Sequence, residues 1–210
     1  MTETPGLAHP RGYDVLAKWS SPSFDPLTRS VIARRIGAPP PRRFFTAAQF
    51  EVLESACARL LATPRGRPPI ASAIDDDLHA GRSEGFRRPG MPRPAAAWRI
   101  GLDGLDGEAR HRHDGRGFVV LDGTAQDAVL QALQQGDVDR SRFGAVAPRL
   151  FFTEVLLKAA VGHYYSRPEA WNEIGFGGPA SPRGYVRIGL DQRDPWEAPF
   201  ATAARHARAR

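Results

Sequence analysis

Apolar residues recur at helical spacing along the central part of the chain, most clearly between residues 46 and 63. The apolar positions of this stretch fall on one face of a helix with 3.6 residues per turn: Phe50, Leu53, Cys57, Leu60 and Leu61. Thr46 and Gln49 have the spacing of a capping box, in which each side chain accepts a hydrogen bond from the other residue's main-chain N–H. Pro64 disfavours continuation, so the helix is expected to end near Thr63.

The same periodicity predicts further helices on both sides of this one. They cover residues 28–36, 70–81, 98–110 and 124–135, and another begins at Pro148. Thr124 is the expected N-cap of the helix over 124–135, and Gly136 is the expected stop. The helix from Pro148 has an apolar stripe too wide for a surface helix, so we expect it at the centre of the core.

Two of these helices contain residues that do not suit a helix interior. Glycines at 101, 104 and 107 weaken the helix over 98–110 by about 1 kcal/mol each relative to alanine. Three consecutive aspartates occupy positions 75–77. Consecutive helical residues point about 100° apart, so the three carboxylates cannot converge on one metal ion, and we expect them on a solvated outer face.

Proline and glycine separate the helical part of the chain from its two ends. Residues 82–97 are interpreted as a long loop or an internal boundary, because prolines and glycines there alternate with arginines. Few stretches show the alternation of a strand, so the predicted fold is mainly α, a small irregular helical bundle with extended, loop-rich N- and C-terminal arms. The expected boundaries are an N-terminal arm at 1–43, a helical domain at 44–162, a C-terminal arm at 163–200 and a disordered basic tail at 201–210.

The C-terminal arm concentrates large aromatic residues among glycines and prolines. Three of the four tyrosines and two of the four tryptophans lie between residues 164 and 196. Gly and Pro exclude a long helix there, while the rings would expose too much apolar surface in water, so the arm lies against the rest of the chain or against a second protein. Trp, Tyr and Arg dominate binding energy at interfaces. The candidate partner-binding residues are Tyr165, Trp171, Phe176, Pro179, Arg183, Tyr185, Arg187 and Trp196.

The chain is basic, with a net charge of +6 and a pI near 10.2. A basic surface favours nucleic-acid binding, and a basic nucleic-acid-binding module is therefore one alternative function. However, the arginines are dispersed and interleaved with 23 acidic residues instead of being clustered on one element. We therefore prefer solvated or partner-paired surface charge, with no nucleic-acid partner.

Candidate catalytic groups are few. Cys57 is the single cysteine, which excludes an internal disulfide and any cysteine-based metal site within the chain. His111 and His113 diverge on a helix and lack an evident third ligand. Gly175-Phe-Gly-Gly is followed by Pro179 and does not open a helix, as a phosphate loop must. We predict no catalytic, cofactor-binding or metal-binding residue, and a stand-alone enzyme is the less favoured alternative.

A distinctive C-terminal pattern runs from Gly162-His-Tyr-Tyr through Trp171-Asn-Glu-Ile-Gly-Phe to Tyr185-Val-Arg187, and continues at Asp194-Pro-Trp-Glu. This pattern resembles the gluconate 2-dehydrogenase subunit 3 family. A looser likeness extends over residues 44–197. The resemblance implies a small non-catalytic subunit that binds a large FAD-dependent dehydrogenase of the glucose-methanol-choline type, which oxidises sugars or related alcohols. The FAD would lie on that partner, and some such complexes also contain a c-type cytochrome.

Localisation follows from the same resemblance and from the lack of an export signal in the sequence. Many members of the family look like carriers of a twin-arginine leader. Here Arg42-Arg43-Phe44-Phe45 is followed by an amphipathic segment, not by a continuous hydrophobic one. No apolar run approaches the roughly 18 residues of a membrane span. We expect a cytoplasmic protein, or a periplasmic one if the partner carries the signal.

Overall fold

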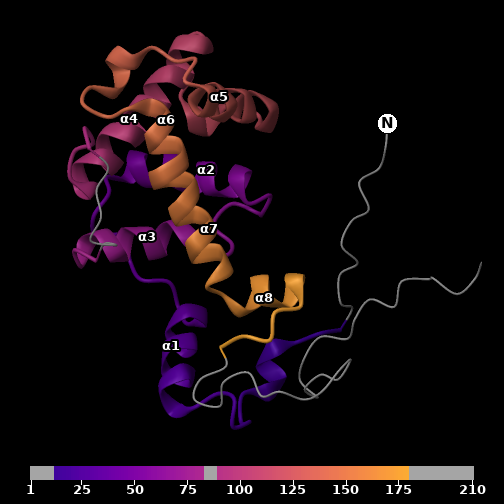
Figure 1. The fold of residues 1–210 in the computed structure, drawn as a ribbon. Helices are drawn as coiled ribbons and strands as arrows, with labels where there is room; N and C mark the ends of the chain where they lie inside the picture. The colour runs from indigo at the N-terminus through magenta and orange to yellow at the C-terminus, as the bar shows by residue number, and fades with distance from the viewer. Residues whose placement is uncertain (1–11, 83–88, 180–210) are drawn as a thin grey trace, which may run out of the picture. The chain divides into compact units, whose positions relative to one another are not determined.

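The computed structural model describes residues 12–82 and 89–179, which divide into two compact units. The helical unit comprises Pro39–Tyr164, and the terminal unit combines the described residues on either side of it, 12–38 and 165–179. Helices make up both units (Figure 1), and no strand occurs within the described ranges. The mainly α fold predicted from the sequence is confirmed.

The helical unit contains the helices that apolar periodicity predicts. They are α2 (Ala47–Leu60), α3 (Ile70–His79), α4 (Pro94–Arg112) and α5 (Gly123–Gln135), followed by one continuous helix in three parts: α6 (Pro148–Leu150), the π-helical segment Phe151–Leu157 and α7 (Lys158–Tyr165). Within the described residues, no helix is long and apolar enough to cross a bilayer. The continuous helix Pro148–Tyr165, which we call the central helix, buries Phe151, Phe152 and Leu156. This burial confirms its predicted place in the core.

Local signals explain where these helices begin. The capping box of α2 is present: the Thr46 side chain accepts from the Gln49 N–H at 3.2 Å, and Gln49 Oε1 accepts from the Thr46 N–H at 3.3 Å. The prediction of Thr124 as N-cap of α5 is wrong, because the N-cap is Asp122, two residues earlier, whose carboxylate accepts from the Ala125 N–H at 2.9 Å. Asp122 satisfies an N–H that would otherwise lack a partner.

The predicted loop over residues 82–97 ends earlier than expected, because α4 already begins at Pro94. Proline suits the first helical position, since its missing N–H would have no partner in the helix there and its φ is already close to the helical value. The prolines of this stretch therefore do not all mark a loop.

The glycines of α4 admit two aromatic rings into the core. A Cβ on Gly101 would lie 2.3 Å from Phe151 Cε2, and a Cβ on Gly104 would lie 2.5 Å from Phe143 Cδ1. Both rings are fully buried. α4 also packs against α2, α5 and the π-helical segment, so it lies at the centre of the helical unit. The helix-weakening glycines at 101 and 104 are thus explained by close packing.

The expectation that the aspartates of α3 lie on a solvated face is wrong for the first of them. Asp75 is fully buried, and its carboxylate accepts main-chain N–H bonds from three successive residues: Arg43 at 2.6 Å, Phe44 at 3.1 Å and Phe45 at 2.9 Å. Asp76 is partly exposed and pairs with Arg43 and Arg82. Asp75 therefore anchors the segment that leads into α2.

The terminal unit is built from both ends of the chain. Residues 12–38 form a short 3₁₀ helix, η1 (Val15–Lys18), and α1 (Pro26–Ile36), which contains the helix predicted at 28–36. Asp25 caps α1 by accepting from the Thr28 N–H at 2.6 Å, and this hydrogen bond lowers the pKa of the Asp25 carboxyl. The C-terminal segment contributes the seven-residue α8 (Pro168–Ile174), which packs against η1.

Candidate partner-binding surface

α8 ends in a Schellman motif formed by its aromatic and glycine residues. Gly175 has φ +69°, a left-handed conformation that glycine adopts without a Cβ clash. Its N–H donates to the Asn172 carbonyl at 3.4 Å, and the Phe176 N–H donates to the Trp171 carbonyl at 2.9 Å. The rings of Phe176 and Trp171 then meet edge to face with centroids 5.8 Å apart, the apolar contact that often accompanies this motif. The sequence Trp-x-x-x-Gly-Phe is therefore a helix stop that fixes the Phe176 ring.

The side chain of Trp171 lies inside the terminal unit. It is 3% exposed and packs in a core cluster with Val15, Phe24 and Ile32, all from the N-terminal segment. Its indole Nε1–H donates to the Tyr165 carbonyl at 2.6 Å, so the polar atom of the buried ring has a partner. Both ends of the chain thus share one small core around Trp171.

Glycine at position 178 closes this core. Gly178 is buried with φ +74°, and a Cβ there would lie 3.3 Å from Val15 Cγ2 and 3.4 Å from Trp171 Cε3. A larger residue would therefore meet both backbone strain and a crowded core. The glycines after α8 serve to turn the chain back over the Trp171 cluster.

Reciprocal arginine contacts join the same two segments. Arg35 Nη1 donates to the Ser166 carbonyl at 2.9 Å, directly after α7, and Arg167 Nη1 donates to the Arg35 carbonyl in the last turn of α1. Carbonyls at helix C-terminal ends lack partners within their own helix, so each arginine satisfies a group that the other segment leaves open. Val15 N–H adds a bond of 2.8 Å to Asn172 Oδ1.

The terminal unit also carries most of the exposed large apolar side chains of the described residues. Five lie in it, with exposed fractions from 38% to 71%: Leu27, Ile36, Tyr165, Ile174 and Phe176; Val120 is their counterpart in the helical unit. Tyr165 and Phe176 both contact Trp171, through its Nε1–H and its ring respectively. Ile174 lies three residues after Trp171 on α8. We call Tyr165, Ile174 and Phe176 the C-terminal rim.

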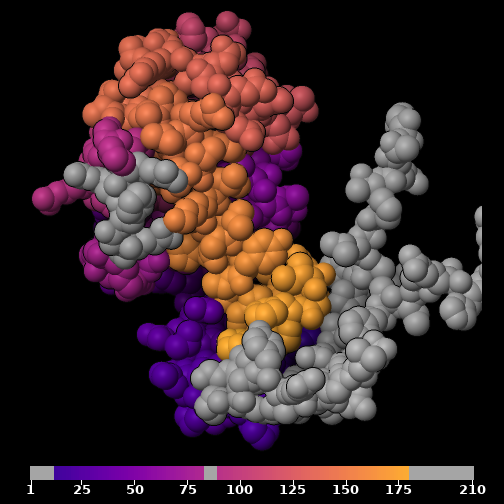
Figure 2. All heavy atoms as spheres, viewed as in Figure 1, coloured from indigo at the N-terminus to yellow at the C-terminus, as the bar shows by residue number. Residues whose placement is uncertain are grey.

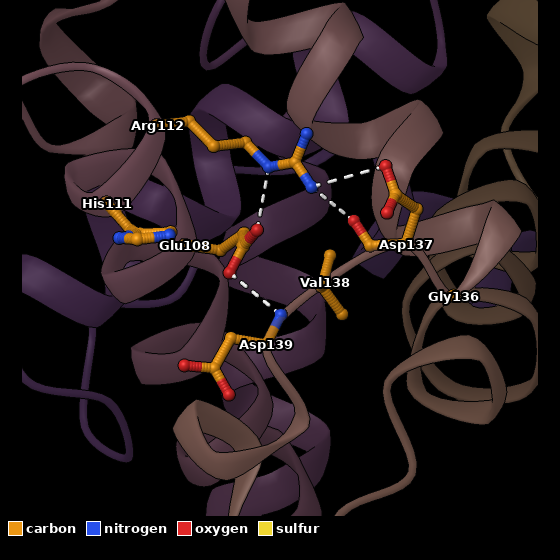
Figure 3. A pocket seen from close by; sticks show the side chains of 7 residues that line it. All are labelled: Glu108, His111, Arg112, Gly136, Asp137, Val138 and Asp139. Atoms are coloured by element: carbon orange, nitrogen blue, oxygen red, sulfur yellow. Dashed lines mark hydrogen bonds and ion pairs between the residues drawn. The ribbon is translucent and has the colours of Figure 1, made fainter.

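The helical unit has a polar pocket of about 260 Å³ at the C-terminal end of α4. Glu108 lies in it, 1% exposed, and accepts from Arg112 Nε at 2.7 Å and from the Asp139 N–H at 3.3 Å (Figure 3). Arg142 Nε is a further ion-pair partner at 3.5 Å. The Glu108 carboxylate is therefore engaged in joining α4 to the segment after α5, which is a structural role.

Many arginines of the helical unit are paired with acids. Arg59 Nε lies 2.8 Å from Asp127 Oδ1, and this hydrogen bond raises the pKa of Arg59 and lowers that of Asp127. Similar pairs join Arg65 to Glu54 at 2.9 Å, Arg82 to Asp77 at 2.7 Å and Arg110 to Asp106 at 2.9 Å. Part of the positive charge of the chain thus serves contacts within the fold.

The remaining candidate groups do not assemble into a site within the described residues. No cluster of three or more His, Cys, Asp or Glu side chains there could hold a metal ion. Cys57 is buried, and burial raises the pKa of its thiol to about 12. A thiol with so high a pKa is almost entirely protonated at neutral pH, and the protonated form is a poor nucleophile.

A comparison with models of known protein families identifies the family of the chain. A family model described as gluconate 2-dehydrogenase subunit 3 matches residues 47–178. The chain belongs to this family. The resemblance recognised in the sequence is thereby confirmed, and the match runs from the start of α2 to Gly178, so it includes Trp171 and the C-terminal rim. Neither the curated proteins nor the solved structures yield a significant match.

The candidate partner-binding residues of this family member fall into four groups. Tyr165 and Phe176 are exposed at 46% and 38%, Pro179 is half-buried, and Trp171 lies in the core of the terminal unit. Four others are outside the described residues: Arg183, Tyr185, Arg187 and Trp196. Sequence reasoning missed Ile174, which is 58% exposed. A residue directly before a helix-ending glycine is usually the last residue of its helix, so the sequence could have placed Ile174 at the end of α8. The neighbouring residues, however, do not indicate which face of α8 is exposed to solvent.

Proposed function

We propose that this chain is a non-catalytic small subunit that binds and stabilises a large FAD-dependent dehydrogenase acting on sugars or related alcohols. The observation that carries the proposal is the family match over residues 47–178, because the family is described as subunit 3 of a dehydrogenase. A third subunit functions together with other chains. The oxidation chemistry would then reside on the large partner, together with the FAD.

The chemistry of the terminal unit supports a role in binding. The C-terminal rim presents two aromatic rings and an isoleucine to solvent on a backbone held by the Schellman motif and the Trp171 core. Burying each such side chain against a partner would contribute about 1.5–3 kcal/mol. Rigid aromatic anchors lose little entropy on binding, so the rim suits a stable contact.

The proposal extends to the composition and location of the complex. A c-type cytochrome subunit is a further candidate component, and it would accept electrons from the flavoprotein. We place the complex in the cytoplasm if neither chain is exported, and in the periplasm if the large subunit carries an export signal. Cell fractionation followed by detection of this chain in each compartment distinguishes the two.

The function is tested by producing the large FAD-dependent dehydrogenase of the same organism with and without this chain. The expected result is more flavin-loaded, active large subunit when the chain is present. Binding of the chain to the folded large subunit shifts the folding equilibrium of that subunit toward its folded form. The measurements are flavin absorbance per large subunit and dehydrogenase activity with a dye acceptor. The isolated 23.0 kDa chain, assayed alone with the same substrates, is the control.

Two outcomes would overturn the proposal. One is a large subunit whose yield, flavin content and activity are the same without this chain. The other is oxidation of the sugar or alcohol by the isolated chain, which would revive the stand-alone enzyme.

A further inference from the structure

The family match and the terminal unit do not cover the same residues. The match begins at residue 47, whereas the core around Trp171 is completed by Val15, Phe24 and Ile32. Trp171 itself lies inside the match. The chain segment that carries the C-terminal rim is therefore supported by residues 12–38, to which the family model does not extend.

This support is a small apolar core in which the polar atom of the Trp171 ring has a partner. Val15, Phe24 and Ile32 are at most 1% exposed, and the Trp171 indole N–H has its hydrogen bond. Arg35 and Arg167 cap each other's segments at the edge of this core. Atoms of α1 and of the segment around α8 adjoin in the space-filling view (Figure 2). A segment held in this way fixes the geometry of the rim before any partner arrives, which reduces the entropy lost on binding.

One exposed apolar residue of α1 follows an arginine that bonds the segment carrying the rim. Ile36 is four residues after Ile32, so both lie on the α1 face that packs on Trp171. Ile36 is 38% exposed and follows Arg35, whose guanidinium bonds the carbonyl of Ser166, the neighbour of Tyr165. Ile36 is thus the exposed apolar residue of α1 that is connected most directly, through Arg35, to the chain segment of the rim. Leu27, at 71% exposure, is five residues before Ile32 and about 140° around α1 from it, on the opposite side.

We propose that residues 12–38 belong to the partner-binding surface: they brace the C-terminal rim and add Ile36 to it. The inference rests on the proposed function, and the occupant is the large FAD-dependent dehydrogenase subunit. Continuity favours this occupant, because Arg35, the neighbour of Ile36, bonds Ser166 in the segment of the rim, and the rim lies within the family-matched region. A second copy of this chain is the competing occupant.

The test uses the full chain and the large subunit as purified proteins, with affinity measured by surface-immobilised binding. Ile36→Asp places a charge at the extended rim, and Leu27→Asp is the matched control on the same helix. We expect Ile36→Asp to weaken binding about tenfold or more, on the scale of interface hot spots, and Leu27→Asp to change it less than about twofold. Circular dichroism checks that each variant is folded, and Ile36→Ser replaces Ile36→Asp if the latter is not.

The outcomes separate this inference from the proposed function. If the wild-type chain does not bind the large subunit, both fail. If it binds and the folded Ile36 variant binds equally well, only the inference fails. Equal losses for the Ile36 and Leu27 variants would also overturn it, since the effect would then be general. Self-association of the chain that is abolished by Ile36→Asp would assign the surface to a second copy and contradict the named occupant.

Discussion

The ring of Phe151 lies directly against the backbone of Gly101, so that a Cβ on Gly101 would sit 2.3 Å from Phe151 Cε2. No ordinary contact is that short, so one of the two helices must shift if residue 101 gains a side chain. Gly101 is buried in α4, and Phe151 begins the π-helical segment of the central helix. Close approach of these two elements depends on a single missing methyl group.

Gly101→Ala should therefore destabilise the helical unit by about 1–3 kcal/mol or more, because overpacking forces backbone movement. Gly107→Ala is the matched control on the same helix, where the nearest atom to a Cβ, Arg142 Cδ, is 4.0 Å away. That change should stabilise by up to about 1 kcal/mol through helix propensity. Urea unfolding followed by circular dichroism measures both. Equal effects of the two substitutions would refute the packing explanation.

Asp75→Asn should lower the free energy of unfolding by about 3 kcal/mol. The carboxylate is fully buried and accepts three main-chain N–H bonds, and hydrogen bonds to a charged acceptor are stronger than those to a neutral one. An amide offers one acceptor oxygen and turns an NH₂ group toward the same donors. Asp76→Asn, which affects partly exposed ion pairs, should cost about 1 kcal/mol or less. Thermal unfolding of the two variants checks the order. An Asp75 variant as stable as the Asp76 variant would contradict the anchoring role.

Gly175→Ala should destabilise the terminal unit by about 1–2 kcal/mol, because residue 175 has φ +69° and a Cβ is strained there. Gly162→Ala provides the comparison, since it lies in α7 with no atom near its added Cβ, and should be neutral or stabilising. Resistance of the C-terminal segment to limited proteolysis is the readout. Unchanged cleavage in the Gly175 variant would count against the Schellman motif as the support of Phe176.

The buried thiol of Cys57 predicts a stability change at alkaline pH. Its pKa is raised from an ordinary 9.0 to about 12 in the folded chain, so the unfolded chain loses the proton first. This contribution to stability is intact below pH 9 and is lost as the pH rises from 9 toward 12, by about 1.4 kcal/mol per pH unit at most. Urea unfolding at several pH values should show this slope in the wild type and a smaller one in Cys57→Ala. Parallel pH profiles of the two proteins would refute it.

The features that sequence predicted correctly are those encoded within a few residues. Thr46 and Gln49 form their capping box three residues apart, and the apolar stripe beginning at Phe151 is regular enough to mark a buried helix. Family membership was likewise visible in the residues around Trp171. Such signals do not depend on where distant segments lie.

The features that sequence could not supply depend on contacts between distant residues. Asp75 is buried because the N–H groups of residues about 30 positions earlier converge on it, and the pattern of α3 alone fits a solvated aspartate equally well. Gly101 looked like a weak point of its helix until the Phe151 ring was placed beside it. Trp171 had the composition of an interface anchor, yet its ring is covered by Val15, Phe24 and Ile32. The same aromatic composition suits self-packing and partner binding.

The most direct test of the account is size-exclusion chromatography with light scattering on the chain co-produced with the large FAD-dependent dehydrogenase of its organism. The account predicts one peak that contains both polypeptides and flavin absorbance, with a mass above that of either chain alone. Separate elution of the two proteins, with the large subunit fully active by itself, would contradict it.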